Sequence, residues 1–315
     1  MCVDLLENGT FFKLICGAGN LDKEYLKRLI YIYAKAGCKV FDIAASQEIL
    51  DTAKQGVLLS EAKEVHYCVS VGIKGDTHIL KAKISSSCSK CGICAQNCPN
   101  EAICPPNIIS EKCIGCGVCA KKCPMKAISM YECDHCNKEL LSNLVNNGTE
   151  IIELHISGND FNDLQHKWKL INEIRPKLAS ICINRDVLGN KEIISYLTYM
   201  VNQRPPFTTI IQADGIPMSG GNCDEDDYKT TLQAVAMAEI IQNSGLPIYL
   251  TLSGGTNSKT MKLCQQCNIY PNGIAIGSAA RKIVKEYIAL SDFWENSDAQ
   301  TQAIKLAKTY MDICM

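Results

Sequence analysis

The chain has 315 residues, a length that suits one large α/β domain or two ordinary domains. Hydrophobic residues make up 47% and charged residues 21% of it, a balance that excludes extensive disorder. Lys and Arg number 32 against 33 Asp and Glu, which excludes a basic whole-chain field of the kind that gathers nucleic acid or anionic membrane.

Short apolar, β-branched runs recur along the chain, and segments with helical periodicity lie between them. These runs are apolar on both faces, as is typical of buried parallel strands. The expected strands begin near Phe12, Lys39, His66, Glu150, Ala179, Thr208, Pro247 and Gly273.

Three of the intervening helices show clear sequence signals. Asp22 is placed to cap a helix that Gly37 ends, and Asp160 is placed to cap another. A third helix is expected to end before Gly245. Its expected buried positions are Leu232, Val235, Ala236 and Ile240.

The spacing of the strands decides the expected architecture. Successive starts are separated by 27, 27, 84, 29, 29, 39 and 26 residues, and removing the cysteine-rich block 76–133 (58 residues) reduces 84 to 26. Eight nearly even β-then-α units predict an α/β fold with a closed, TIM-like (β/α)8 barrel rather than an open doubly wound sheet. The expected domains are residues 1–75 (first part of the barrel), 76–133 (a ferredoxin-like insertion) and 134–315 (the rest of the barrel).

The insertion follows the third strand, so it is expected over the C-terminal face of the barrel, where βα loops carry function. The 39-residue interval marks a long loop after the sixth strand, DGIPMSGGNCDEDDYK. This loop is a candidate lid or binding loop, and a plain surface excursion is the alternative.

Twenty cysteines stand out in this composition. No apolar run approaches the roughly 18 residues of a membrane span, and Asp4, Glu7 and Lys13 interrupt the first apolar stretch, unlike a signal peptide. We therefore expect a cytoplasmic protein without a membrane span, whose cysteines serve as metal ligands rather than disulfides.

The motif C-x2-C-x2-C-x3-C-P occurs twice, in residues 88–103 and again 25 residues later in 113–128. In this motif three thiolates from one loop bind one iron–sulfur cube, and the fourth cysteine binds the other cube. Zinc sites or disulfides are the alternatives, but three cysteines at these gaps followed by Cys-Pro, twice, are not typical of zinc knuckles. We predict two [4Fe–4S] clusters. The first set is Cys88, Cys91, Cys94 and Cys123, and the second is Cys98, Cys113, Cys116 and Cys119.

The remaining cysteines are less informative. Cys16, Cys38, Cys68 and Cys182 lie in or beside strands, where buried small hydrophobes are the simpler interpretation. The pairs Cys133/Cys136 and Cys264/Cys267 each form half a metal site, so a third metal or redox pair stays open.

Small residues follow the seventh and eighth strands. Backbone amides there can approach a phosphate, as in many (β/α)8 enzymes. The predicted residues that bind FMN or another phosphate-bearing ligand are Gly254, Gly255, Thr256, Gly277 and Ser278. The alternative is that these glycines only make tight turns.

Polar residues near other strand ends include Asp42, Gln212 and Asp214, which could bind a ligand or handle a proton, or serve structure alone. His155 and His166 have no visible partner and are interpreted as core or surface residues. No catalytic set emerges, so the catalytic residues stay unassigned.

Several stretches together resemble one family. They are FFKLICGAGN, AGCKVFDIAAS, the double cysteine block, IIQADGIPMSGG and LTLSGGTNSKT. Over essentially the whole chain the sequence resembles the cyanobacterial light-dependent period protein (LdpA) family. That resemblance implies an iron–sulfur protein tied to redox and light input to the circadian clock. It carries over only the eight ferredoxin-type cysteines as functional residues.

Three hypotheses about function follow. The first is a redox-sensing regulatory protein whose clusters change the barrel's contacts with a redox or regulatory partner protein. The second is an oxidoreductase in which the clusters exchange electrons with a flavin or similar ligand at the barrel mouth. In the third, a plain electron carrier, the barrel is scaffold. No nucleic-acid partner is expected.

Overall fold

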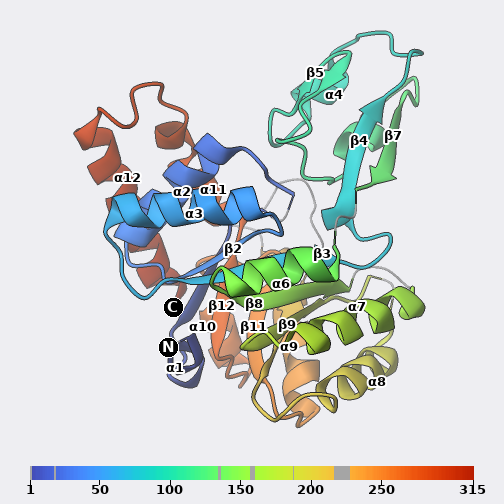
Figure 1. The fold of residues 1–315 in the computed structure, drawn as a ribbon, viewed down its shortest axis with the longest axis vertical. Coiled ribbons are helices and arrows are strands. Elements are labelled where there is room, and N and C mark those ends of the chain that lie inside the picture. Colours follow the sequence, from blue (N-terminus) through green and yellow to red (C-terminus); the bar gives the residue numbers. More distant parts are fainter. Residues whose placement is uncertain (1, 18, 134–135, 157–159, 187, 216–227) are drawn as a thin grey trace.

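The computed structural model describes residues 2–17, 19–133, 136–156, 160–186, 188–215 and 228–315. Within them, eight parallel strands close into a barrel with flanking helices (Figure 1), which confirms the expected fold class. Around the barrel the strands are β1 (Phe11–Ile15), β2 (Val40–Ala44), β3 (His66–Gly72), β8 (Thr149–Ile156), β9 (Leu178–Ile183), β10 (Thr209–Asp214), β11 (Tyr249–Ser253) and β12 (Gly273–Ile276). Each begins within two residues of its expected start, because two-sided burial selects the same β-branched runs that the pattern shows.

Helices cover the outside of the barrel. Asp22 caps α2 (Lys23–Lys35) by accepting a hydrogen bond from the Tyr25 amide, and Asp160 caps α7 (Phe161–Ile174) through the Asp163 amide. The other barrel helices are α3 (Gln47–Ser60), α6 (Lys138–Asn146), α8 (Asn190–Val201), α9 (Tyr228–Asn243), α10 (Thr260–Gln266), α11 (Ser278–Ile288) and α12 (Ser297–Cys314).

Helix α9 forms where it was expected, but of its four expected buried positions only Val235 is buried. Leu232 is 46% exposed, and Ala236 and Ile240 are only half-buried. Ala234, Met237 and other small or flexible residues pack inward instead. Since the apolar residues of α9 are not gathered on one clear face, its periodicity could not decide which side meets the barrel.

The N-terminal end of the barrel is closed by α1 (Cys2–Glu7). Cys2 and Leu6 pack there against the first inward-facing residues of the strands, among them Phe11, Val40 and Ile151. This apolar layer separates the solvent below from the polar side chains higher in the barrel.

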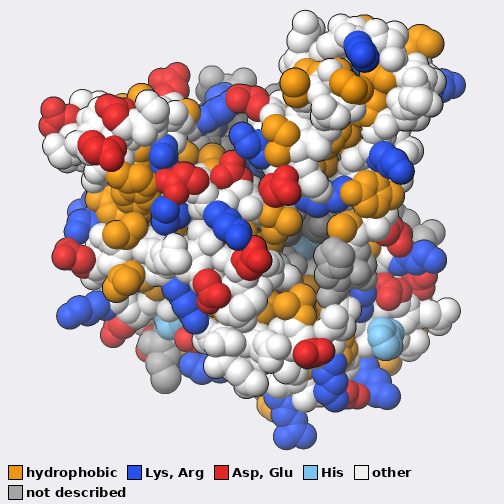
Figure 2. Space-filling model, turned by 45° about the horizontal axis from the view of Figure 1, so that its top comes forward, with side chains coloured by type: hydrophobic (Ala, Val, Ile, Leu, Met, Phe, Trp, Pro, Cys, Tyr) orange, Lys and Arg blue, Asp and Glu red, His pale blue; other side chains and the backbone are white. Residues whose placement is uncertain are grey.

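The insertion lies between β3 and β8 in sequence and rises above the barrel as a separate lobe (Figures 1 and 2). Strands β4 (Leu80–Ile84) and β7 (Ile128–Glu132) form its antiparallel stem. Between them lie α4 (Ile93–Gln96), α5 (Val118–Lys122) and the short pair β5 (Ile103–Cys104) and β6 (Asn107–Ile108), and a 3₁₀ turn at Thr77–Ile79 precedes β4. The loops of the two cysteine motifs therefore sit between the strands of one hairpin-like stem.

Candidate functional site

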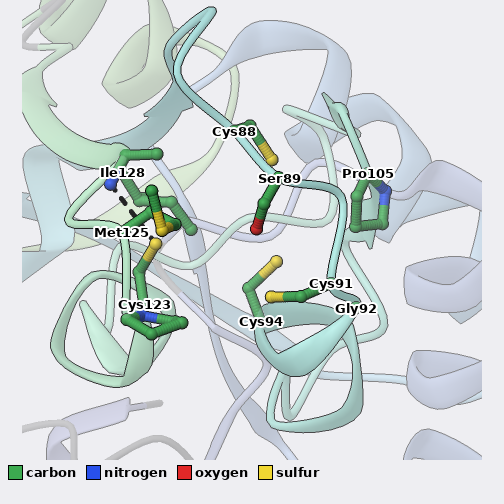
Figure 3. A pocket seen from close by; sticks show the side chains of 11 residues that line it. Cys88, Ser89, Cys91, Gly92, Cys94, Pro105, Cys123, Met125 and Ile128 are labelled. Atoms are coloured by element: carbon green, nitrogen blue, oxygen red, sulfur yellow. Dashed lines mark hydrogen bonds between the residues drawn. The ribbon is translucent and has the colours of Figure 1, made fainter.

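The first predicted cysteine set lines one small cavity of the insertion. Cys88 and Cys91 lie in the loop before α4 and Cys94 lies in α4 itself, while Cys123 follows α5. In Figure 3 the Cys123 sulfur faces the other three from the opposite side of the cavity, which Met125 and other apolar groups also line. Four thiols around one apolar-walled space suit an iron–sulfur cube.

The second predicted set lines a second, similar cavity. Cys113 and Cys116 lie in the loop before α5 and Cys119 lies in α5 itself, while Cys98 follows α4. Each cavity thus takes three cysteines from one motif and one from the other, as the spacing predicts.

The backbone around the cavities repeats with the same 25-residue offset. Gly92 and Gly117, with φ of 79° and 70°, begin α4 and α5 in the left-handed region that favours glycine. The Ala102 amide donates to Cys98 Sγ at 3.2 Å, and the Ala127 amide donates to Cys123 Sγ at 3.3 Å. Amide donors of this kind stabilise negative charge on sulfur and so tune the potential of a cluster.

Lys81 ties the second cavity to the barrel. Its buried ammonium donates to the backbone oxygens of Gly19, in the loop after β1, and of Ser110 and Cys113 in the insertion. Burial lowers the pKa of Lys81. The Leu21 amide also donates a 2.8 Å hydrogen bond to the backbone oxygen of Glu111. The cavity that contains Cys113 is therefore in direct contact with a barrel loop.

A groove runs between the insertion and the barrel. Cys98 and Lys122 line its insertion side, and Ser278, Arg281 and Lys285 of α11 line its barrel side. Among its described lining residues, the six basic ones outnumber the three acidic ones, so the groove favours an anion. Lys285 also forms a 2.9 Å ion pair with Glu101 across it.

Of the predicted phosphate-binding residues, three are packed into the barrel wall. A side chain at Gly254 would collide with Asp214, and one at Gly255 would lie 2.5 Å from Thr230 Cβ. The Thr256 hydroxyl donates to the Ala275 oxygen at 2.6 Å. Close packing thus accounts for small residues after β11, whereas Ser278, which follows Gly277 at the start of α11, lines the groove.

The inside of the barrel holds a polar layer above the apolar one. Lys13 of β1 donates to Glu153 Oε2, and its Nζ lies 3.5 Å from Asp42 Oδ2. Glu153 also accepts from Ser180 at 2.7 Å and from Gln212 at 3.0 Å. Asp42 and Gln212, singled out from the sequence, therefore belong to one buried network that includes Lys13 and Glu153.

For Lys13 and Glu153, attraction between opposite charges has a larger effect on the pKa than burial has. Burial alone would raise the pKa of Glu153, but Lys13 and His155 hold it well below its usual range. Burial likewise opposes the charge on Lys13, yet Glu153 raises the pKa of that ammonium. For Asp42 burial wins, and its pKa is raised.

His155, interpreted from the sequence as a core or surface residue, is buried and has partners that the sequence did not reveal. Its Nε2 lies 3.1 Å from Glu153 Oε1 and 3.3 Å from Ser70 Oγ. Burial alone would lower the pKa of His155, but Cys182 and Glu153 raise it well above its usual value. Since burial raises the pKa of the Cys182 thiol to about 11, Glu153 is the anion beside His155 near neutral pH.

Sequence reasoning missed Lys13 and Glu153, and it assigned Cys182 to the apolar core. A signal for them exists: polar residues stand two apart in otherwise apolar strands, as in Glu153 and His155 of β8. That spacing places both side chains on the same face of a strand. Only closure of the barrel brings such pairs from different strands together.

Neither extra cysteine pair forms a compact donor set among the described residues. Cys264 is buried in α10 while Cys267 is exposed at its end, and Cys133 and Cys136 are half-buried. Residues 216–227 of the long loop after β10 lie outside the described residues, so its expected role as a lid or binding loop stays a prediction.

Comparison with known proteins identifies the family. A model described as the light dependent period A C-terminal domain matches residues 143–311. The chain belongs to the light dependent period A (LdpA) family. Light dependent period A from Synechococcus elongatus is 28% identical over an alignment of 326 residues. The alignment covers 98% of this chain and 90% of that protein.

A second model, described as a 4Fe-4S binding domain, matches residues 106–129. This segment contains Cys113, Cys116, Cys119 and Cys123. Together with the relative, it makes the chain an iron–sulfur protein related to LdpA.

Similarity to solved structures concerns only the fold of this LdpA-family chain. Tryptophan synthase from Mycobacterium tuberculosis aligns with a TM-score of 0.50 and 7% identity, covering 99% of this chain and 96% of that chain. A putative fructose-1,6-biphosphate aldolase from Coccidioides immitis aligns with a TM-score of 0.49 and 10% identity, covering 99% and 94%. None of the described helices of the LdpA-family chain is long and apolar enough to cross a membrane.

Proposed function

We propose that this LdpA-family protein is a redox-sensing regulatory protein that carries two [4Fe–4S] clusters. Residues 76–133 are its ferredoxin-like domain, and residues 1–75 and 134–315 together form its barrel. Cys88, Cys91, Cys94 and Cys123 hold one cluster, while Cys98, Cys113, Cys116 and Cys119 hold the other. The observation that carries this proposal is that each predicted set lines its own cavity.

The second cluster is the one that reports to the barrel. Its ligand Cys113 shares the Lys81 ammonium with Gly19 of the barrel through their backbone oxygens. A one-electron change of cluster charge beside a buried ammonium alters the electrostatic free energy of this contact, because screening by water is weak there. The barrel then changes how it binds a redox or regulatory partner protein.

The biological role we propose follows the relative. The name light dependent period A links that protein to light and to period. We infer that the present chain likewise passes redox or light input to the circadian clock of a host that has one, and that it acts in the cytoplasm.

Iron analysis of protein purified without oxygen tests the cluster proposal. We expect about eight irons per chain in the wild type and about half as many in Cys88→Ser or Cys113→Ser. Cys104→Ser is the matched control, since this exposed cysteine of the insertion lines neither cavity. Zinc in place of iron, or full iron content in both motif variants, would overturn the proposal.

Hydrogen exchange in the oxidised and dithionite-reduced protein tests the sensing role. We expect the amides of residues 19–22 and 109–114 to change protection with redox state, because Lys81 joins these two loops. Barrel strand β9 serves as the internal control. Identical exchange of the two loops in both states would remove the basis for redox sensing.

The basic groove favours a second candidate function, an oxidoreductase that binds FMN or another phosphate-bearing ligand at the barrel mouth. Here Gly277 and Ser278 would face the phosphate, with Gly254, Gly255 and Thr256 shaping the neighbouring wall. Titration with FMN should quench flavin fluorescence to saturation, and Ser278→Asp should weaken binding at least about tenfold, since it adds an anion at the phosphate position. Absence of saturable quenching would reject this candidate.

A further inference from the structure

We propose that Glu153, His155 and Cys182 form a binding site for a divalent metal ion of the zinc class inside the barrel, separate from the cysteine cavities. Among the residues that the structure describes, these three make up the one group whose donor atoms all lie within 4.8 Å of one another. All three side chains are buried. The set combines one nitrogen, one sulfur and one carboxylate oxygen, which are the ligand types that Zn²⁺ takes.

The barrel itself brings the three donors together. Glu153 and His155 stand two apart on β8, so both face the interior. His155 pairs directly with Cys182 in the register between β8 and β9. The donors therefore rest on two hydrogen-bonded neighbouring strands, which hold ligands more firmly than loops do.

Surrounding groups hold the carboxylate in place. Lys13 and Ser180 both donate to Glu153 Oε2, and Gln212 donates to Oε1. Hydrogen bonds of this kind orient metal ligands and raise the affinity of a site. The Lys13 charge also offsets the carboxylates of Glu153 and Asp42, so the layer can bind a thiolate–metal pair without a large excess of negative charge.

Three protein ligands leave a coordination position open for water or substrate. The neighbouring strand ends supply polar groups on that side: Ser253 Oγ lies 3.8 Å from Cys182 Sγ and donates to Asp214 at 3.1 Å. Since the site lies toward the C-terminal ends of the strands, the class of ligand we assign to it is a small molecule with a carbonyl or phosphoryl oxygen, which the metal would polarise. Cys182 binds as the thiolate and His155 as the neutral imidazole, so one proton from each leaves to solvent when the metal enters.

The test uses Zn²⁺ itself as the probe on the full-length protein with its iron in place. After removal of loosely bound metal and addition of Zn²⁺, we expect about one zinc per chain. X-ray absorption at the zinc edge should show one sulfur at about 2.3 Å and nitrogen or oxygen ligands at about 2.0–2.2 Å. This measurement needs no variant, and it is independent of the proposed clusters because it reports zinc alone.

The matched variants are Cys182→Ala and Cys68→Ala, which each remove a buried thiol from the barrel interior. We expect Cys182→Ala to weaken zinc binding by at least about tenfold and to lose the sulfur signal, while Cys68→Ala keeps both. Iron content should stay at the wild-type value in both variants. Absence of bound zinc, a shell of sulfur alone (zinc in the cysteine cavities), or equal affinity of the two variants would overturn the proposal and leave the three side chains as a hydrogen-bonded core.

Discussion

The insertion and the barrel interior differ in how far apart in sequence their candidate functional side chains lie. In the insertion the candidate ligands are cysteines a few residues apart, and three of the seven buried apolar residues in the described core of that lobe are themselves cysteines. In the barrel, Lys13, Asp42, Glu153 and Cys182 come from four strands far apart in sequence, within a much larger apolar shell. The chemistry of a local motif is thus visible in the sequence, whereas the dispersed network forms only when the barrel folds.

Removal of iron is the change that should produce the largest difference in stability between the insertion and the barrel. Without a metal, so small a core cannot order the insertion, but the barrel needs none to fold. We expect hydrogen exchange of the apoprotein to show loss of protection throughout β4 and β7 and retained protection in β2, β3 and β9. Protected β4 amides in iron-free protein would contradict this view of the insertion.

Glu153→Gln should have the opposite effect: it should destabilise the barrel and leave the insertion unchanged. This change leaves the buried Lys13 charge without its closest anion, and breaking a buried pair costs about 3–5 kcal/mol. Urea unfolding of the barrel should report this loss, while iron content stays unchanged. The double variant Lys13→Met/Glu153→Gln is the control, since removing both charges should restore most of the stability; a double variant as unstable as the single one would refute the pairing.

The same pair predicts a pH dependence confined to the barrel. Because the native pKa of Glu153 is held well below its usual value, the stabilisation is complete above the unfolded value of about 4.3 and is lost as the pH falls toward the native pKa. The stability difference between wild type and Glu153→Gln should therefore stay constant above about pH 5 and shrink as the pH falls below about 4. A constant difference would show that Glu153 carries no such shift.

Lys81→Met should have a smaller effect, at the boundary of the two regions. Three backbone oxygens lose a charged donor, at a cost of about 1–3 kcal/mol. We expect the second cluster to be lost faster in air than the first, measured as biphasic bleaching of visible absorbance. Lys83→Met, an exposed lysine on the same strand, is the control and should bleach like the wild type. Equal bleaching of Lys81→Met and Lys83→Met would show that Lys81 does not hold the boundary.

Lys285→Ala should have the smallest effect of all. Its ion pair with Glu101 also joins insertion and barrel, but the two side chains are 56% and 72% exposed. Exposed pairs contribute less than about 1 kcal/mol, so stability and cluster lifetime should match the wild type within error. A loss as large as that of Lys81→Met would mean that the boundary is held by surface charge.

The sequence by itself determined the strands and the barrel, and it predicted the two cysteine sets. Strand runs such as HYCVSVG are buried on both faces, and the even spacing of such runs leaves few alternatives to a closed barrel. The cysteine sets were readable because ligands that share a loop keep their spacing whatever surrounds them.

Only the tertiary structure decided the inward face of α9, the contact of Lys81 with Gly19 and Cys113, and the meeting of Glu153, His155 and Cys182. These features depend on which parts of the chain become neighbours when the barrel closes. Polar residues at every second position show which side chains of one strand share a face. The residues that they meet on other strands depend on strand register and on barrel closure, which the linear sequence does not show.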